Sequence, residues 1–474
     1  MSEAPHVVVI GGGISGLAAA HALVRSERVR VTVLEADSRL GGKIRSESIA
    51  SQKIDVGAES LFARTPVAIE LCRELGLADE LIAATQTATA VWTRGRLREL
   101  PAGILGGLPD GVGPVLRSGI LSPLGLARAG LDLLLPASSV DGDRSVGELV
   151  RRRLGRQALD RLVDPLLGTI YAADCEELSA RATAPQLDAL ARSHRSLIGA
   201  LRAAGPAPPQ TGPLFVTLPG GLERIVARMG EQLREADIRC DVPVSLLRRS
   251  PYGRYQLDTP GLQAPQLHEL DASPGCSPPW DGVVIATPHH QAARILSDLS
   301  PKAAMELRSI GCSSTVVVTL RYAAAAVRAP RPLAGFLVPR SERRLLGACT
   351  WLSSKWPHLA ATGELWLRCS VGRASTASAL QLDDTELVTR LADELREAMG
   401  LHGKPLSTHV TRWERALPRY EPGHLDRVGR IEGELTALPG IELAGAAYRG
   451  MGVPQCIAQG RAAAERVLTA IADL

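Results

Sequence analysis

The sequence predicts an α/β fold, α+β overall, in which a Rossmann-like domain is combined with an antiparallel-sheet domain and a helical lobe. Two observations lead to the Rossmann-like part. A β-branched strand, a glycine turn and an alanine-rich helix follow one another at residues 7–23, and a strand, a glycine-bearing turn and a long helix close the chain at residues 441–474. Strand-like segments at residues 314–322 and 364–371 supply the second sheet.

Composition and charge describe an ordinary globular chain. The 474 residues are 45% hydrophobic and 22% charged, with a formal net charge of +4. We find no apolar run long enough to span a bilayer, no export signal and no lysine-rich tract, so we expect a cytoplasmic protein without a nucleic-acid partner. The eight cysteines are scattered without metal-ligand spacing, and we interpret them as reduced thiols and expect no bound metal.

The N-terminal motif has the order of a dinucleotide-binding turn. The strand VVVI leads directly into Gly-Gly-Gly-Ile-Ser-Gly, which opens a helix. One glycine permits the tight turn, a second lets the backbone approach a diphosphate, and a third lets helix and strand pack closely. The diphosphate would lie at the helix N-terminus, where N–H groups favour anions. The candidate residues are Gly11, Gly12, Gly13, Ile14, Ser15 and Gly16.

An acidic residue stands where such a site needs one. The second strand, VRVTVLE, ends at Glu35, nineteen residues after Gly16, and its carboxylate can accept hydrogen bonds from ribose hydroxyls. A glycine-rich turn without a ligand would not explain this acid. The two features together predict a dinucleotide site.

The residues behind the acid distinguish a flavin site from a nicotinamide site. Arg39, a glycine pair and Lys43 follow, and DVGAES occupies residues 55–60. The succession resembles the flavin-containing amine oxidase and protoporphyrinogen oxidase superfamily. The resemblance implies FAD as the cofactor and a backbone that closes over the flavin, although Arg39 and Lys43 could instead be solvated charges. The further cofactor candidates are Ala36, Arg39, Gly42, Lys43, Gly57, Ala58, Glu59 and Ser60.

The C-terminal segment supports the flavin interpretation. In the resembling family its helix aims the N-terminus at the pyrimidine end of the flavin, where it stabilises negative charge on the reduced ring. The family pattern also implies contacts from other segments, although the tryptophan among them could equally be a core aromatic. These candidates are Val244, Ala286, Trp413, Met451, Gly452 and Val453.

The same resemblance implies three domains. A discontinuous FAD-binding domain would comprise residues 1–89, 209–300 and 418–474, a substrate-binding sheet domain residues 301–417, and a helical lobe residues 90–208. The lobe contains an apolar stretch broken by glycine and proline. For this stretch we weigh peripheral membrane contact against a buried helical face or substrate entrance, and slightly favour the latter.

The central region resembles porphyrinogen oxidases. Residues 165–201 carry Gly-x-x-Tyr-Ala and Leu-Ser, and LRCSVGRA at residues 367–374 looks like the corresponding stretch of enzymes that oxidise coproporphyrinogen III. The resemblance implies an FAD- and oxygen-dependent oxidoreductase acting on CH–CH groups in haem biosynthesis, which forms coproporphyrin III and releases hydrogen peroxide. Protoporphyrinogen IX oxidase is the alternative, followed by a flavin amine oxidase or a non-catalytic flavin or porphyrin carrier. An aromatic content of only 3% argues against the aromatic cage of an amine oxidase.

The resemblance also implies a broad apolar substrate pocket. The candidate pocket residues are Leu166, Thr169, Tyr171, Ala334, Ser370 and Arg373. The arginines that could pair with substrate carboxylates, or could be structural, are Arg94, Arg96, Arg98 and Arg373. Some relatives have an arginine where this chain has Thr89. No pairing of side chains suggests a general base, so the catalytic residue stays unknown.

The expected partners follow from the same resemblance. They are a porphyrinogen and O2, with handover of the product to a ferrochelatase-type enzyme. A monomer or a homodimer is compatible with the sequence, as is peripheral attachment to the cytoplasmic face of the membrane.

Overall fold

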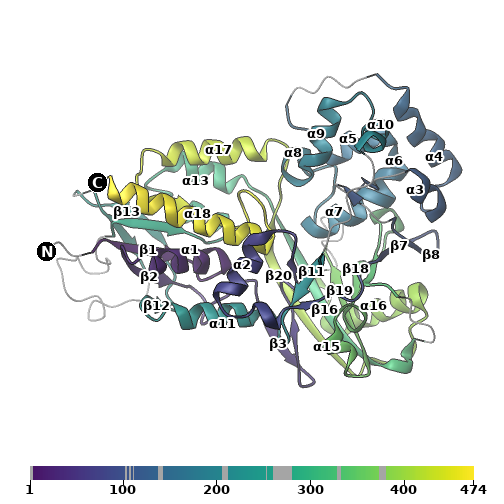
Figure 1. Ribbon diagram of the computed structural model, residues 1–474, viewed down its shortest axis with the longest axis horizontal. Helices are drawn as coiled ribbons and strands as arrows, with labels where there is room; N and C mark the ends of the chain where they lie inside the picture. Colours follow the sequence, from purple (N-terminus) through teal and green to yellow (C-terminus); the bar gives the residue numbers. More distant parts are fainter. Residues whose placement is uncertain are drawn as a thin grey trace. The chain divides into compact units, whose positions relative to one another are not determined.

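The computed structural model describes residues 4–473 apart from 102–103, 106–107, 110–111, 137–141, 205–211, 252, 260–279, 328–331 and 373–379. Its contacts divide the chain into two compact units (Figure 1). The first unit comprises Met1–Leu81, Val216–Ile310 and Leu425–Leu474, and the second comprises Ile82–Phe215 and Gly311–His424. The helices of the expected lobe and the second sheet thus share one unit, and the three-domain division stays a prediction.

The first unit is built from short strands and longer helices. They are β1 (His6–Ile10), α1 (Ile14–Arg25), β2 (Arg30–Leu34), β3 (Ser46–Ile49), β4 (Gln52–Asp55), β5 (Leu61–Phe62), α2 (Pro66–Glu74), a 3₁₀ turn (Ala78–Glu80), α11 (Glu223–Gln232), β12 (Asp237–Arg239), β13 (Leu246–Arg249), β14 (Tyr255–Asp258), β15 (Gly282–Ile285), α12 (His289–Ile295), α13 (Pro301–Arg308), α17 (His424–Leu435), β21 (Ile441–Leu443) and α18 (Val453–Ala472).

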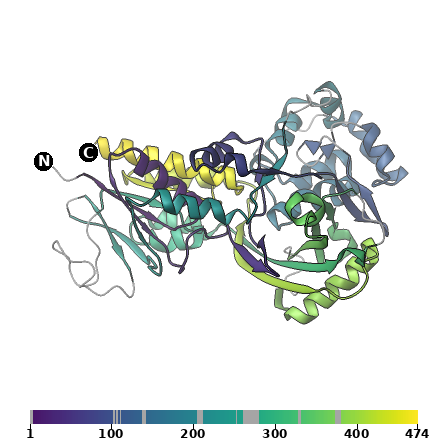
Figure 2. The same ribbon diagram turned by 60° about the horizontal axis from the view of Figure 1, so that its bottom comes forward.

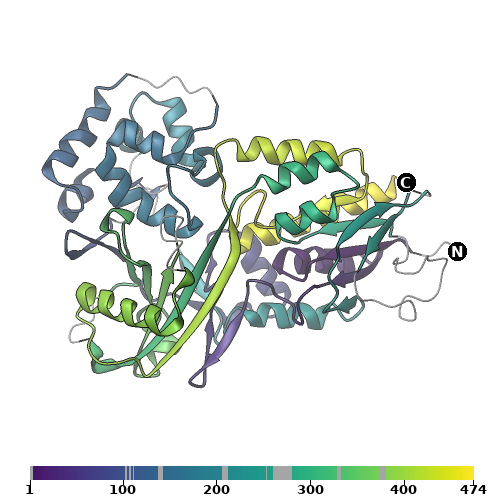
Figure 3. The same ribbon diagram turned by 180° about the vertical axis from the view of Figure 1, so that it is seen from behind.

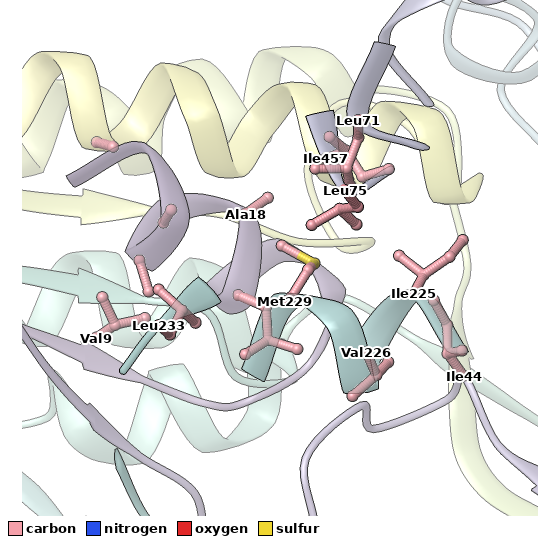
Figure 4. Close-up of a cluster of buried hydrophobic side chains, with 14 of the residues drawn as sticks. Val9, Ala18, Ile44, Leu71, Leu75, Ile225, Val226, Met229, Leu233 and Ile457 are labelled. Carbon is pink, nitrogen blue, oxygen red and sulfur yellow. The ribbon is translucent and has the colours of Figure 1, made fainter. Parts of the chain in front are cut away.

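A parallel five-stranded sheet forms the centre of the first unit. Its strand order is β12-β2-β1-β15-β21, and every pairing is parallel. Because side chains alternate across a strand, β1 points Val7 and Val9 into one core cluster and Val8 and Ile10 into another. Helices α1, α2, α11 and α18 cover the first cluster (Figure 4), and α12, α13 and α17 cover the second (Figure 3). The continuous VVVI run is therefore buried on both faces, as a parallel strand requires.

Helix α18 lies along α1 in the first unit (Figure 1). A Cβ on Gly460 of α18 would lie 2.1 Å from the carbonyl oxygen of Ser15 and 3.1 Å from the Cβ of Ala18. Glycine at this position therefore lets the two helix backbones approach more closely than any side chain would permit.

The second unit contains the helical segment and a larger sheet. Its elements are β6 (Ile82–Ala83), β7 (Thr89–Thr93), β8 (Arg96–Glu99), β9 (Ile104–Leu105), β10 (Leu108–Pro109), α3 (Val112–Ser118), α4 (Pro123–Gly130), a 3₁₀ turn (Leu131–Leu133), α5 (Val146–Leu154), α6 (Arg156–Ala158), a π-helical turn (Leu159–Val163), α7 (Asp164–Tyr171), α8 (Ala180–Thr183), α9 (Pro185–Ser193), α10 (Leu197–Ala204), β16 (Cys312–Ala323), 3₁₀ turns (Ala324–Ala326 and Arg340–Glu342), β17 (Gly335–Leu337), β18 (Leu346–Trp351), α14 (Leu352–Lys355), α15 (Pro357–Ala360), β19 (Glu364–Val371), α16 (Asp384–Met399) and β20 (Ser407–Pro418). The boundary between the two units falls within β11 (Phe215–Thr217).

The seven-stranded sheet of the second unit is mixed, whereas we expected an antiparallel sheet. Its order is β20-β16-β19-β18-β17-β7-β8, and β7 pairs with β17 in parallel. A long stretch of chain separates these two strands, so no tight hairpin forces them to run in opposite directions. Helix α16 packs on one face (Figure 2), and helices α5 and α7 pack on the other.

None of the helices among the described residues combines the length and the apolar character needed to cross a bilayer.

We predict that Gly460→Ala destabilises the first unit, because its new Cβ would collide with the backbone of α1. Overpacking of this kind costs roughly 1–3 kcal/mol in the free energy of unfolding. The matched control is Gly429→Ala in α17, where a Cβ would meet no atom within 4 Å. This control should be neutral or up to about 1 kcal/mol stabilising. Denaturation midpoints of the FAD-loaded proteins measure both, and equal midpoints for the two variants would contradict the close helix packing.

Candidate functional site

The turn between β1 and α1 brings backbones into contact. Gly11 has φ of +106°, and a Cβ there would lie 2.9 Å from the carbonyl oxygen of Ala286. A Cβ on Gly16 would lie 1.9 Å from the carbonyl oxygen of Gly11. Only glycine therefore lets β1, α1 and the end of β15 meet, and this contact places Ala286 beside the turn.

Gly13 leaves an open cradle at the start of α1. It is the N-cap residue, and no side chain caps the helix. No atom lies within 4 Å of the position that its Cβ would occupy. The first-turn N–H groups, which begin at Ile14 and Ser15, are thus left to bind an anion such as a diphosphate.

Glu35 ends β2 beside this cradle. Its carboxylate accepts hydrogen bonds from the N–H of Gly12 at 2.5 Å and from the N–H of Asp37 at 2.8 Å. Its carbonyl accepts from the N–H of Val242 at 2.8 Å, which brings the segment with the half-buried Val244 alongside. The arrangement suits the ribose and adenine end of a dinucleotide.

The second glycine pair lies directly against the first. Gly41 donates its N–H to the carbonyl of Gly12 at 2.8 Å, and a Cβ on Gly42 would lie 3.3 Å from the Cα of Gly13. Both residues of the pair have positive φ, +103° and +54°. Backbone contact therefore explains why this chain needs glycines behind the acid.

Arg39 shapes the same loop through its guanidinium group. Nη1 donates to the carbonyl of Leu40 at 2.9 Å, and Nη2 donates to the carbonyl of Gly42 at 2.7 Å. The charge thus fixes the loop backbone, whereas Ala36 and Lys43 are exposed. A direct contact with the diphosphate is not required to explain Arg39.

Residues 57–60 run beside this loop and are half-buried. Ala58 donates its N–H to the carbonyl of Lys43 at 3.2 Å. The preceding Asp55 is buried and accepts the N–H of Leu222 at 3.0 Å, which ties the segment to the start of α11.

The C-terminal turn presents a second helix start without a capping side chain. Gly452 is the N-cap residue of α18. Gln459 donates through Nε2 to the carbonyl of Gly450 at 3.0 Å, and Sγ of Cys456 donates to the carbonyl of Met451 at 3.7 Å. Both bonds fold the turn back onto the helix that it opens.

The two helix starts are neighbours. Cys456, in the first turns of α18, forms a side-chain hydrogen bond with Ser15, in the first turn of α1. Burial raises the pKa of the Cys456 thiol, and this hydrogen bond acts in the opposite direction. The positive ends of two helix dipoles therefore lie in one part of the first unit, where they favour a negatively charged or electron-rich group.

The candidate substrate residues and Trp413 belong to the second unit. Ser370 pairs with Ala348 and with Val317, and Trp413 pairs with Thr315. Residues directly opposite each other point to the same face, as do positions two apart on one strand. Ser370 and Trp413 therefore share the sheet face opposite to α16.

Helix α7 covers part of that face. Leu166 and Tyr171 pack against the cluster that contains Leu337 and Ala348. Burial raises the pKa of Tyr171 to about 12, so its phenol stays neutral at physiological pH. This end of α7 thus offers an apolar surface with a neutral hydroxyl.

The remaining candidates lie near the same elements. Ala334 precedes β17 and donates its N–H to the carbonyl of Ala88 at 2.7 Å. Thr169 turns its hydroxyl to the carbonyl of Pro165 at 2.6 Å. Arg373 falls outside the described residues.

The first unit combines a parallel sheet, a glycine cradle, a carboxylate at the end of β2 and two adjacent helix starts. This combination defines a dinucleotide-binding oxidoreductase. Residues 14–468 match the family described as flavin containing amine oxidoreductase. The chain belongs to this family, and its cofactor is FAD. The predictions of family, fold class and cofactor are therefore confirmed.

Individual relatives match over the full length. The chain is 33% identical to coproporphyrinogen III oxidase of Bacillus subtilis (strain 168) over 98% of each chain. It is 30% identical to protoporphyrinogen oxidase of Bos taurus, again over 98% of each. The fold also matches a crystal structure from Exiguobacterium sp. 255-15, of a protein provisionally named a protoporphyrinogen oxidase. The TM-score is 0.84 at 30% sequence identity, and the match covers 100% of both chains.

Sequence reasoning did not single out the residues that support the cradle. Asp55 acts through a backbone group of a distant segment, and Cys456 and Gln459 act through carbonyls of the turn that precedes their own helix. The only sequence signal was their place next to glycine-rich stretches, which does not say what a side chain bonds to.

We predict that Glu35→Gln weakens FAD binding about tenfold, because a neutral amide replaces the charged acceptor beside the ribose position. The matched control is Glu70→Gln, which removes one negative charge from the exposed side of α2. Flavin fluorescence during titration of the apoprotein with FAD measures both affinities. An unchanged affinity for Glu35→Gln would remove Glu35 from the cofactor site.

Proposed function

We propose that this protein oxidises coproporphyrinogen III to coproporphyrin III in haem biosynthesis, with O2 as acceptor and hydrogen peroxide as the second product. The observation that carries the proposal is the full-length similarity to a coproporphyrinogen III oxidase, which extends over both units. Similarity confined to the first unit would support flavin binding alone. Here it includes the sheet face and α7, which we assign to the substrate.

Bound FAD would supply the redox chemistry, a two-electron oxidation of the porphyrinogen coupled to reduction of O2. The residues of this chain supply binding and electrostatics. The start of α1 would hold the diphosphate, Glu35 the ribose, and the start of α18 would stabilise negative charge near the ring. Three rounds of hydride and proton loss then convert the macrocycle to the aromatic porphyrin.

The substrate side would work by position rather than by acid–base catalysis. Leu166, Ala334 and the neutral Tyr171 offer a largely apolar surface for a broad macrocycle. Ser370 and Trp413 would continue this surface along the sheet. The aromaticity gained in the last step reduces the need for a strong base.

Protoporphyrinogen IX is the second candidate substrate, because the Bos taurus relative is named a protoporphyrinogen oxidase and the match covers 98% of its length. The two substrates differ in their peripheral groups, four propionates against two propionates and two vinyls. Cytoplasmic location, peripheral membrane contact, handover to a ferrochelatase-type enzyme and the choice between monomer and homodimer stay predictions.

A comparison of rates tests the proposed substrate. We expect porphyrin fluorescence to rise at a higher kcat/KM with coproporphyrinogen III than with protoporphyrinogen IX. Anaerobic coproporphyrinogen III should bleach the bound flavin, and air should restore its colour. A preference for protoporphyrinogen IX would assign the second candidate, and a flavin that neither substrate bleaches would leave only a carrier.

We also predict that Ser370→Phe raises KM for the porphyrinogen at least tenfold, because the new ring would fill space on the face that we assign to the macrocycle. FAD content should stay unchanged, since Ser370 belongs to the second unit. The matched control is Ser193→Phe, at an exposed position of α9. Equal KM values for the two variants would remove Ser370 from the substrate surface.

A further inference from the structure

Three arginine side chains of the second unit converge on one turn, at Gly119–Ile120. Arg94 donates through Nη1 to the carbonyl of Gly119 at 3.4 Å, and Arg161 donates through Nη1 to the carbonyl of Ile120 at 3.3 Å. Nη1 of Arg98 is so close that a Cβ on Gly119 would lie 2.9 Å from it. The turn can accept this guanidinium only because its residue is glycine.

These arginines lack acidic partners. Among the described residues, no ion pair joins a carboxylate to Arg94, Arg96, Arg98 or Arg161. The Nε atom of Arg98 is buried, and none of the described residues forms a hydrogen bond with it. Burial lowers the pKa of Arg98, and the positive charges of Arg94, Arg96 and Arg161 lower it further.

Two acids beside these arginines, Glu342 in space and Asp160 in sequence, bond to other groups. Glu342 accepts hydrogen bonds from the hydroxyl of Thr93 at 2.9 Å and from the backbone N–H of Arg94 at 3.1 Å. Asp160 pairs with Arg156 at 3.4 Å. Neither carboxylate bonds to the converging guanidinium groups.

The β7–β8 hairpin, which carries Arg94, Arg96 and Arg98, has left-handed residues in its turn. Arg94 and Gly95, between β7 and β8, have φ of +56° and +71°. Asparagine or glycine is the usual residue at the first of these positions, because a left-handed conformation disfavours long side chains. The chain therefore accepts a backbone cost in order to keep an arginine there.

Positive charges that lie together without acidic partners lower the stability of the folded protein, and such unfavourable arrangements are typical of functional sites. We propose that Arg94, Arg98 and Arg161 form an oxyanion-binding site at the Gly119–Ile120 turn, for a ligand that carries two or more carboxylate or phosphate oxygens. Guanidinium groups suit this chemistry because their planar donors match such oxygens in pairs.

The site does not depend on the proposed porphyrinogen chemistry, because its residues all belong to the second unit and none is a candidate for the FAD cradle. Three sources offer the required oxygens, namely tetrapyrrole propionates, free phosphates and phospholipid headgroups. All three present negatively charged oxygens that guanidinium groups can bind.

Pyrophosphate is the probe for the first experiment. Calorimetric titration of the FAD-loaded full chain at low ionic strength should give saturable binding. Arg98→Gln and Arg161→Gln should each weaken it about tenfold or more. The matched control, Arg152→Gln, removes the same charge from an exposed position of α5 and should bind like the wild type. Equal weakening by all three variants would reduce the effect to net charge and overturn the site.

The unfolding temperature is a second measurement, and a purely structural role of Arg98 would change it in the opposite direction. Without anions, Arg98→Gln should unfold at the same or a higher temperature than the wild type, because it relieves repulsion. Pyrophosphate should raise the midpoint of the wild type and of Arg152→Gln, but not that of Arg98→Gln. A marked loss of stability in Arg98→Gln without anions would make Arg98 a structural residue and overturn the proposal.

Competition identifies the source of the oxyanion once binding is established. Displacement of pyrophosphate by coproporphyrin III assigns tetrapyrrole carboxylates. Displacement by vesicles containing phosphatidylglycerol, and not by vesicles of phosphatidylcholine alone, assigns lipid headgroups. Displacement by inorganic phosphate only assigns a free phosphate. Each of these outcomes supports the site, and failure of the wild type to bind pyrophosphate more tightly than Arg98→Gln excludes it.

Discussion

Direct contact between backbones at glycine positions is the constraint on which the first unit depends. Gly11 meets the end of β15, Gly16 meets the carbonyl of Gly11, and Gly460 brings α18 onto α1. A methyl group on Gly460 would push apart segments from the two ends of the sequence, and one on Gly11 or Gly16 would disrupt the turn between β1 and α1. The cofactor cradle exists because these contacts hold two helix starts together, with no capping side chain at either.

The alternation of side chains across a strand then assigns each sheet face its role. In the first unit both faces of the parallel sheet are buried, so binding groups can lie only beyond the strand ends, at Gly13 and Glu35. In the second unit one face is packed by α16. The register of β16, β19 and β20 turns Ser370 and Trp413 to the opposite face, where α7 lies.

Charge is handled in two contrasting ways within the helical segment of the second unit. Asp132 is fully buried, and it accepts hydrogen bonds from Arg153 at 2.5 Å and from Ser196 and the backbone of Ile198. That pair is satisfied and therefore structural. The arginines around Gly119 bond instead to backbone carbonyls and to the side chain of Gln157, and no acid neutralises them among the described residues, so we assign them to a ligand.

The sequence by itself determined the opening strand, the glycine cradle and the acid after β2, because these depend on residues near one another in the chain, where period and spacing act locally. It could not give the parallel pairing of β7 with β17 or the hydrogen bond between Asp55 and the backbone of Leu222. Only the tertiary structure decided these, since each joins a side chain or strand to a partner that the fold, and not the spacing, brings near. The convergence of Arg94, Arg98 and Arg161 on Gly119–Ile120 is of the same kind, because the spacing of residues along the chain does not say which side chains lie close together in space.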